Sequence, residues 1–249
     1  MKKNYLINTK AKVVVNQKTT VPASNIKLAI EKTHDILAKF KTFPVDVFAL
    51  LGMRNLSGFV GEIFVAALED TANGMFKKNP HQDGYPDLLL MDKAGRDLWR
   101  SLSERLQEKD PFSPFPTGGL EIKATCGSTP SASVLAKRGD RKPVIGESRI
   151  YMINNYCWAA HHRETNQLMS LLWDFDNGTP FIAAVFYSNN LTREDWGKIS
   201  SPHGTGRTTS SCSLRQSGVK KLYNGWVTCI DDSRYINFLN KRNKSNLIS

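Results

Sequence analysis

Two short apolar segments that carry charged residues constrain the fold more than any other feature of the chain. The first is YPDLLLMD (85–92), entered through Pro86, a residue tolerated at the first position of a strand. The second is LEIKAT (120–125), which follows the turn-rich stretch PFSPFPTGG. Their lengths and boundaries predict strands over 87–91 and 120–125. The fold must bury the apolar side chains of both strands and give their charged side chains polar surroundings.

The charge balance of the 249 residues points to a polyanionic partner. Lysine and arginine number 34 against 23 acidic residues, which gives a formal net charge of +11. Such an excess suits nucleic acid better than an acidic protein or a neutral metabolite. Nucleic acid is therefore the leading partner.

Alternation along the second strand places Glu121 and Lys123 on one side and Leu120 and Ile122 on the core side. If the two strands pair, Asp87 lies beside Glu121, so that two carboxylates and an ammonium share one exposed edge. Such a site suits Mg²⁺, with the Ile122 carbonyl as a further ligand. Lys123 would then act on the attacking water and the scissile phosphate.

Pro86-Asp87 on one strand and Glu121-x-Lys123 on the next resemble the signature of the PD-(D/E)xK nuclease superfamily, which includes most type II restriction endonucleases. The resemblance implies an α/β (α+β) fold, in which a central mixed β-sheet is flanked by helices. It further implies Mg²⁺-dependent cleavage of double-stranded DNA at a specific short site, with Mn²⁺ able to substitute, by a homodimer that cuts both strands. Residues 93–119 then form a helical insertion within the catalytic hairpin.

The superfamily often adds an acidic residue from a helix that precedes the two strands. Glu62, in SGFVGEIF (57–64), matches that residue in type, helical context and order. The resemblance implies that Glu62 either binds the metal or supports the site without binding it.

Two other functions stay open on the sequence. One is a structure-selective nuclease of the same fold, such as a junction resolvase or a repair nicking enzyme. The other is a basic DNA-binding module without catalysis, in which Asp87, Glu121 and Lys123 are surface charges.

Basic residues cluster in two segments rich in glycine, serine and threonine, which can approach phosphates and groove edges. The first cluster belongs to an exposed loop over 127–149, and the second to a C-terminal segment over 197–249 expected to contact DNA. The candidate DNA-binding residues are Lys137, Arg138, Arg141, Lys142, Arg207, Arg215, Lys220 and Lys221.

Periodicity elsewhere predicts a single domain over 1–249 with two early helices and several later strands. The first helix, near 24–40, would be capped by Ser24-Asn25, and the second, near 57–72, would bury Phe59, Ile63, Ala66 and Ala67. A third helix would carry Leu98, Leu102 and Leu106, and strands are expected at 150–156, 168–175, 181–188 and 222–230.

Several classes of protein are disfavoured. No apolar run approaches the roughly 18 residues of a membrane span, and the start lacks a signal-peptide pattern, so a cytoplasmic protein is expected. No G-x-x-x-x-G-K-[ST] motif occurs, which predicts cleavage without a nucleotide cofactor. The four cysteines form no C-x-x-C pair and read as reduced thiols. His161-His162 reads as structural, because neighbouring residues on a strand face opposite ways.

Overall fold

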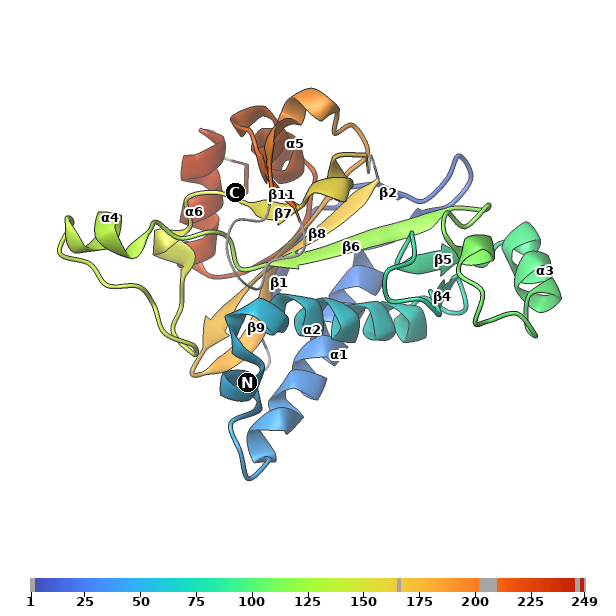
Figure 1. Ribbon diagram of the computed structural model, residues 1–249, viewed down its shortest axis with the longest axis horizontal. Coiled ribbons are helices and arrows are strands. Elements are labelled where there is room, and N and C mark those ends of the chain that lie inside the picture. Colours follow the sequence, from blue (N-terminus) through green and yellow to red (C-terminus); the bar gives the residue numbers. More distant parts are fainter. Residues whose placement is uncertain (1–2, 165–166, 202–209, 245–246, 249) are drawn as a thin grey trace.

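A seven-stranded mixed sheet forms the centre of the protein, as the sequence predicts. The computed structural model describes residues 3–164, 167–201, 210–244 and 247–248, without the side chains of Arg54 and Glu164 (Figure 1). In spatial order the strands are β1 (Tyr5–Ile7), β12 (Trp226–Ile230), β9 (Thr179–Ser188), β8 (Leu168–Asp176), β6 (Gly119–Thr125), β5 (Leu88–Leu90) and β4 (Phe76–Lys78). β6 and β8 are parallel, and the other neighbouring pairs are antiparallel.

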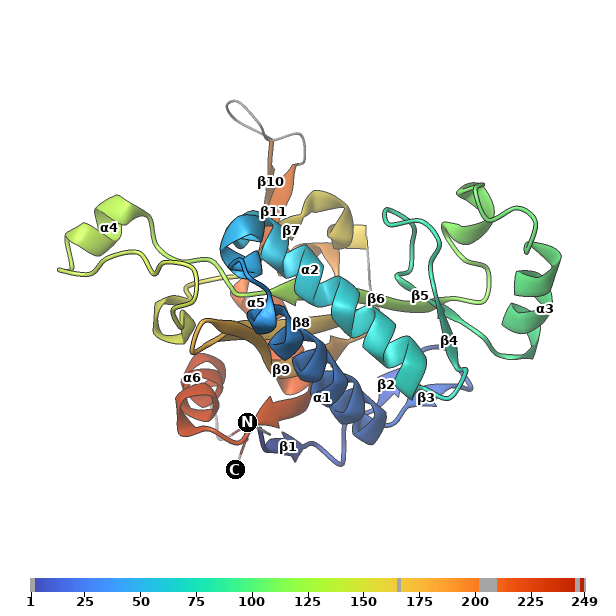
Figure 2. The same cartoon turned by 90° about the horizontal axis from the view of Figure 1, so that it is seen from below.

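Helices cover both faces of this sheet (Figures 1 and 2). One face packs against α1 (Ala23–Lys39) and α2 (Val47–Thr71), toward which Met169, Leu171 and Trp173 of β8 point. The other face packs against α5 (Gln216–Asn224), α6 (Ser233–Asn243) and a second sheet of β10 (Trp196–Ser200), β11 (Ser211–Leu214) and β7 (Cys157–Ala159). Both faces of the central strands are therefore buried.

Short elements complete the chain. They are β2 (Val13–Val14), β3 (Thr20–Val21), α3 (Lys93–Ser101), α4 (Ala132–Ala136) and the 3₁₀ helices Phe40–Thr42, Asp110–Phe112, Ile150–Met152, Ala160–Glu164 (η4) and Arg193–Asp195. α3 and α4 lie at opposite ends of the molecule (Figures 1 and 2).

The first helix matches its predicted span, but its predicted cap is wrong. Pro22 occupies the N-cap position in an extended conformation and offers no side-chain hydrogen bond, so the helix starts one residue before Ser24. The Pro22 carbonyl accepts hydrogen bonds from the Asn25 and Ile26 N–H groups, so the first turn forms without a side-chain cap.

The second helix is longer than predicted and buries a different face. It starts at Val47, where Asp46 accepts a hydrogen bond from Ala49, and it bends at Gly52. The most buried residues are Leu56, Val60, Phe64, Ala67 and Leu68, whereas Phe59 and Ile63 are half-buried and Ala66 is exposed. Residues 63–68 are all apolar, so periodicity alone does not identify the core face.

The described residues contain no single helix long and apolar enough to cross a membrane. The two bent parts of α2, Val47–Met53 and Asn55–Thr71, reach that length and composition only when they are counted together.

The insertion over 93–119 leaves the pairing of β5 and β6 intact. β5 and β6 are antiparallel, with Leu88 opposite Leu120 and Leu89 opposite Gly119. α3 ends at Ser101, so the predicted helix is too long, and Leu106 is 36% exposed. The insertion forms its own apolar cluster with the outer side of β5, made of Leu89, Met91, Leu102, Phe112 and Phe115.

Three predictions for the second half of the chain need correction. Residues 150–156 contain a 3₁₀ helix, and the nearby strand β7 begins only at Cys157. The segment 222–230 is divided between the end of α5 and β12, with Gly225 between them. The exposed loop over 127–149 includes the short helix α4. In contrast, β8 and β9 match the predicted strands 168–175 and 181–188 closely.

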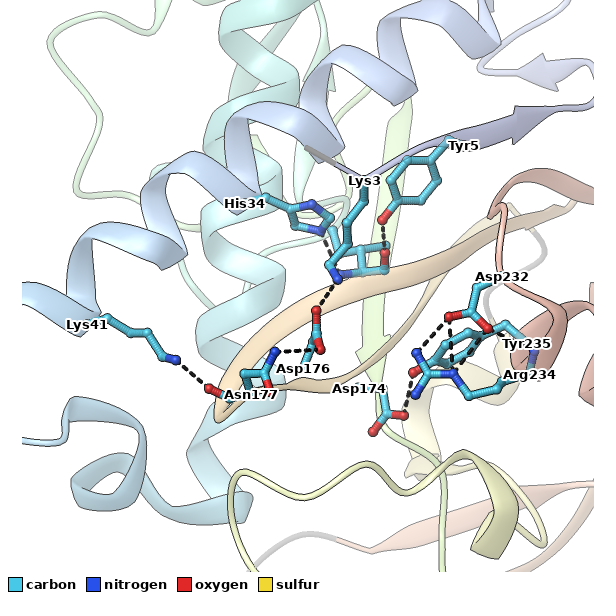
Figure 3. A network of polar contacts seen from close by, with 11 residues as sticks. Lys3, Tyr5, His34, Lys41, Asp174, Asp176, Asn177, Asp232, Arg234 and Tyr235 are labelled. Carbon is cyan, nitrogen blue, oxygen red and sulfur yellow. Dashed lines mark hydrogen bonds and ion pairs between the residues drawn. The ribbon is translucent and has the colours of Figure 1, made fainter. Parts of the chain in front are cut away.

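Where β9 extends beyond the end of its neighbour β12, side chains provide hydrogen-bond partners for its backbone. Cys229 pairs with Ala184 and β12 ends at Ile230, so Ile182 lies past the last residue of that strand. The Ile182 N–H donates to His34 Nε2 of α1 at 2.9 Å, and its carbonyl accepts a hydrogen bond from the Tyr5 hydroxyl (Figure 3). These two bonds replace strand pairing, and the bond to His34 also fastens α1 to the sheet.

Candidate active site

Strand pairing brings Asp87 against the start of β6, as predicted. Continuing the register of β5 and β6 by one residue puts Asp87 opposite Glu121. Its Oδ2 accepts a hydrogen bond of 2.7 Å from the Ile122 N–H. β5 starts only at Leu88, so it does not extend far enough to pair with Ile122. The Asp87 side chain therefore accepts the hydrogen bond of the Ile122 N–H in place of a strand backbone.

The two charged residues of β6 lie on the side predicted for them, but Glu121 is not at an exposed edge. Leu120 and Ile122 join the core beneath α1 and α2. Glu121 is only 5% exposed, and η4 contributes to its burial. Its Oε1 lies 3.3 Å from Lys123 Nζ and 3.4 Å from Nδ1 of His162 in η4. The carboxylate is therefore buried beside one cation.

Half-buried Asp87 and buried Glu121 bring two carboxylates together, and Lys123 is the cation beside them. Burial raises the pKa of Glu121, and the neighbouring charge of Asp87 raises it further. Burial also raises the pKa of Asp87, against the opposing effects of Lys123 and the Ile122 N–H. Glu121 Oε2 is buried and has no hydrogen-bond partner among the described residues. A bound cation would relieve this unpaired charge.

The donor set fits Mg²⁺ better than a transition metal. Among the residues that the structure describes, no three His, Cys, Asp or Glu side chains gather closely enough to hold a metal ion by themselves. Asp87 and Glu121 would thus be the two carboxylate ligands of an ion that takes its remaining oxygens from backbone, water or phosphate. Mg²⁺ is commonly bound in this way, through one or two carboxylates, while it keeps several waters.

Glu62 reaches the same cleft from α2, but another residue binds its carboxylate. Its Oε2 lies 2.5 Å from Lys78 Nζ of β4. The charge of Glu62 also contributes to the raised pKa of Asp87, after burial. This arrangement favours a supporting position for Glu62 over that of a free metal ligand.

Asp87 and Lys123 line a cleft of about 720 Å³, and Glu121 is buried beside it. α2 forms one wall with Gly58, Gly61 and Glu62, and β6 forms the floor with Lys123. The opposite wall comes from β7, η4 and β11, and it includes Trp158. The side chain of Lys123 is 27% exposed, so it reaches the open space of the cleft.

His162 is a site residue that the sequence does not reveal. The prediction for His161-His162 assumed a strand, but both lie in η4, where their ring centroids are 3.9 Å apart. His162 is 2% exposed, and burial, Lys123 and His161 lower its pKa to about 2. Its ring is therefore neutral at neutral pH. No local pattern could have placed it beside Glu121, because the contact depends on how η4 packs.

Some of the predicted DNA-binding residues are exposed, whereas others form ion pairs within the protein. Lys137, Arg138 and Lys142 are exposed around α4, whereas Arg141 forms an ion pair with Glu147 at 2.8 Å. Lys221 forms an ion pair with the buried carboxylate of Asp195 at 2.6 Å, so its charge already has a partner within the protein. Arg215 and Lys220 are exposed at α5, and Arg207 lies outside the described residues.

No protein-family profile, curated protein or solved structure matches this chain. The residues of the cleft therefore provide the basis for a functional proposal.

Proposed function

We propose that this protein is a Mg²⁺-dependent DNA endonuclease of the type II restriction class, with Asp87, Glu121 and Lys123 in its active site. The observation that carries the proposal is the pairing of half-buried Asp87 with buried Glu121, one oxygen of which has no partner among the described residues, beside a lysine that reaches an open cleft. The mixed sheet, with helices on both faces, is consistent with a restriction-endonuclease-like core.

The protein's own residues would divide the reaction between them. Asp87 and Glu121 would hold the ion. Lys123 would stabilise the developing charge on the phosphate as an ammonium or, in its neutral form, accept a proton from the attacking water. When bound, Mg²⁺ would polarise the scissile phosphate and lower the pKa of a water ligand. The neutral ring of His162, 3.4 Å from Glu121 Oε1, would help to keep that carboxylate in position.

The charge of the surface supports DNA as the substrate. The chain has a net charge of +11, and the exposed cations Lys137, Arg138 and Lys142 project with α4 at one end of the molecule. Cations on such an arm can contact phosphates beyond the cleft. A homodimer acting in the cytoplasm, with one cleft for each strand, completes the proposal.

Digestion of a long DNA of mixed sequence with Mg²⁺, followed by sequencing of the ends, tests this function. Discrete fragments with a common end sequence are expected. Cleavage confined to branched DNA would instead identify a structure-selective nuclease. DNA binding without cleavage of any substrate, in Mg²⁺ or Mn²⁺, would identify a binding module and refute the enzyme assignment.

A further inference from the structure

A second cavity, of about 450 Å³, is rich in cationic side chains. We call it the basic pocket. One carboxylate, that of Glu194, belongs to its lining, and this residue is exposed. The cations that line the pocket are Arg163, Arg193, Lys198 and Arg215. Burial raises the pKa of the nearby Cys212 thiol, while the charges of Arg163 and Arg215 both oppose that rise. These two guanidinium groups therefore act on the same region.

Two residues that line this pocket carry buried donors without partners among the described residues. Trp196 is 1% exposed, and its indole Nε1 makes no hydrogen bond within the described part of the chain. Arg163 Nε is also buried and without a partner there. A buried donor without an acceptor is unfavourable, and a ligand that brings acceptor oxygens would satisfy both groups. Together with the excess of cations, these donors favour an anion with several oxygens.

The basic pocket adjoins the active-site cleft. His162 lines the cleft, and the next residue of η4, Arg163, lines the pocket. Trp158 lines the cleft and packs against Trp196, which lines the pocket, with ring centroids 5.8 Å apart. One pair of tryptophan rings therefore connects the two cavities. A polymer with regularly spaced anions could place one anion in each.

We propose that the basic pocket binds a phosphodiester of the DNA strand whose scissile phosphate lies in the cleft. This inference rests on the proposed function. A guanidinium group can donate two hydrogen bonds to phosphate oxygens, and Arg163 and Arg215 bring two such groups. Contacts to the phosphate backbone fix the register of a protein on DNA without reading its sequence. The pocket thus positions the strand for cleavage at Lys123.

Neutral phosphate analogues test the pocket directly. Binding of the full-length protein to short duplexes is measured in Ca²⁺, which allows binding without requiring cleavage, while single phosphates are replaced by methylphosphonates. In the wild-type protein, substitution at one or two adjacent positions should weaken binding roughly tenfold or more, as for the loss of a charged hydrogen bond.

Variants assign that effect to the pocket. Arg215→Ala should bind unmodified DNA roughly tenfold more weakly and should no longer respond to the sensitive methylphosphonates. Trp196→Phe keeps an aromatic ring but removes Nε1, so it should reduce the same response. Lys39→Ala, which removes an exposed charge from α1 on the opposite face of the sheet, is the matched control and should keep the wild-type response. Thermal unfolding of each variant checks its fold.

The outcomes separate the pocket from the proposed nuclease activity. If folded Arg215→Ala keeps the wild-type pattern, or if only removal of a 5′-terminal phosphate weakens binding, the phosphodiester site is refuted even when the wild type cuts DNA. A pocket-dependent pattern in a protein that never cuts DNA supports the pocket and refutes the nuclease. A wild-type protein that binds no duplex overturns both.

Discussion

Acid should destabilise the protein through His34, and His34→Gln should remove that sensitivity. His34 Nε2 accepts a hydrogen bond from the Ile182 N–H, which only an unprotonated nitrogen can do (Figure 3). Burial of the ring, assisted by the charge of Lys3, lowers the pKa of His34 from 6.5 to about 4. The glutamine side chain offers a carbonyl oxygen as acceptor but does not titrate.

The direction of this pH dependence follows from whether the folded or the unfolded chain binds the proton more tightly. Between pH 6.5 and about pH 4, the unfolded chain is protonated at His34 while the folded chain is not. The contribution to stability is therefore fully present above pH 6.5 and is lost as the pH falls toward 4. The lowered pKa of His34 contributes at most ~3 kcal/mol to the free energy of unfolding, and about 2 kcal/mol of this contribution is lost by pH 5.

Urea unfolding of the wild type and His34→Gln at pH 7 and pH 5 measures the effect. Other groups titrate in both proteins, so the comparison is between their pH-dependent changes. Over this range the wild type should lose about 2 kcal/mol more free energy of unfolding than the variant does. Equal losses in the two proteins would refute the assigned role of His34.

Three further predictions concern the active site and its surroundings. EDTA should abolish cleavage, Mg²⁺ or Mn²⁺ should restore it, and Ca²⁺ should support binding with little turnover, whereas full activity in excess EDTA would exclude the proposed metal site. Replacing Arg138 and Lys142 with alanine should make DNA binding less sensitive to salt. The slope of the logarithm of the binding constant against the logarithm of salt concentration should fall by about one unit for each phosphate that the protein no longer neutralises, whereas an unchanged slope would show that α4 faces away from DNA. Glu62→Gln should reduce the cleavage rate less than Asp87→Ala does, because Lys78 binds the Glu62 carboxylate, and equal reductions would indicate a direct metal ligand.

The sequence predicts the centre of the site because that centre depends on local patterns. A strand of alternating residues fixes which side Glu121 and Lys123 share, and a second short strand places Asp87 beside them. The long strands β8 and β9 are equally predictable from their apolar runs. The strands themselves need no knowledge of distant contacts, whereas the position of Asp87 beside Glu121 also depends on the pairing of β5 with β6 across the insertion.

Other features depend on packing between distant segments. The contact between His162 and Glu121 requires η4 to cover β6, and no residue near His162 indicates this. Likewise, the engagement of Lys221 by Asp195 cannot be read from a basic loop. In α2, the apolar stretch 63–68 contains candidates for several core faces, and the tertiary packing selects the one that includes Phe64.

The central claim is that Lys123 acts on a phosphate beside a cation held by Asp87 and Glu121. Its most direct test is the rate of DNA cleavage by folded Lys123→Ala under saturating Mg²⁺, with Lys93→Ala as a control for removal of an exposed positive charge. Lys123→Ala should bind DNA with near-normal affinity but lose at least ~10²–10³ in cleavage rate, whereas Lys93→Ala should cut normally. Cleavage by Lys123→Ala within about tenfold of the wild-type rate, a loss of only ~1.4 kcal/mol in transition-state stabilisation, would contradict this assignment.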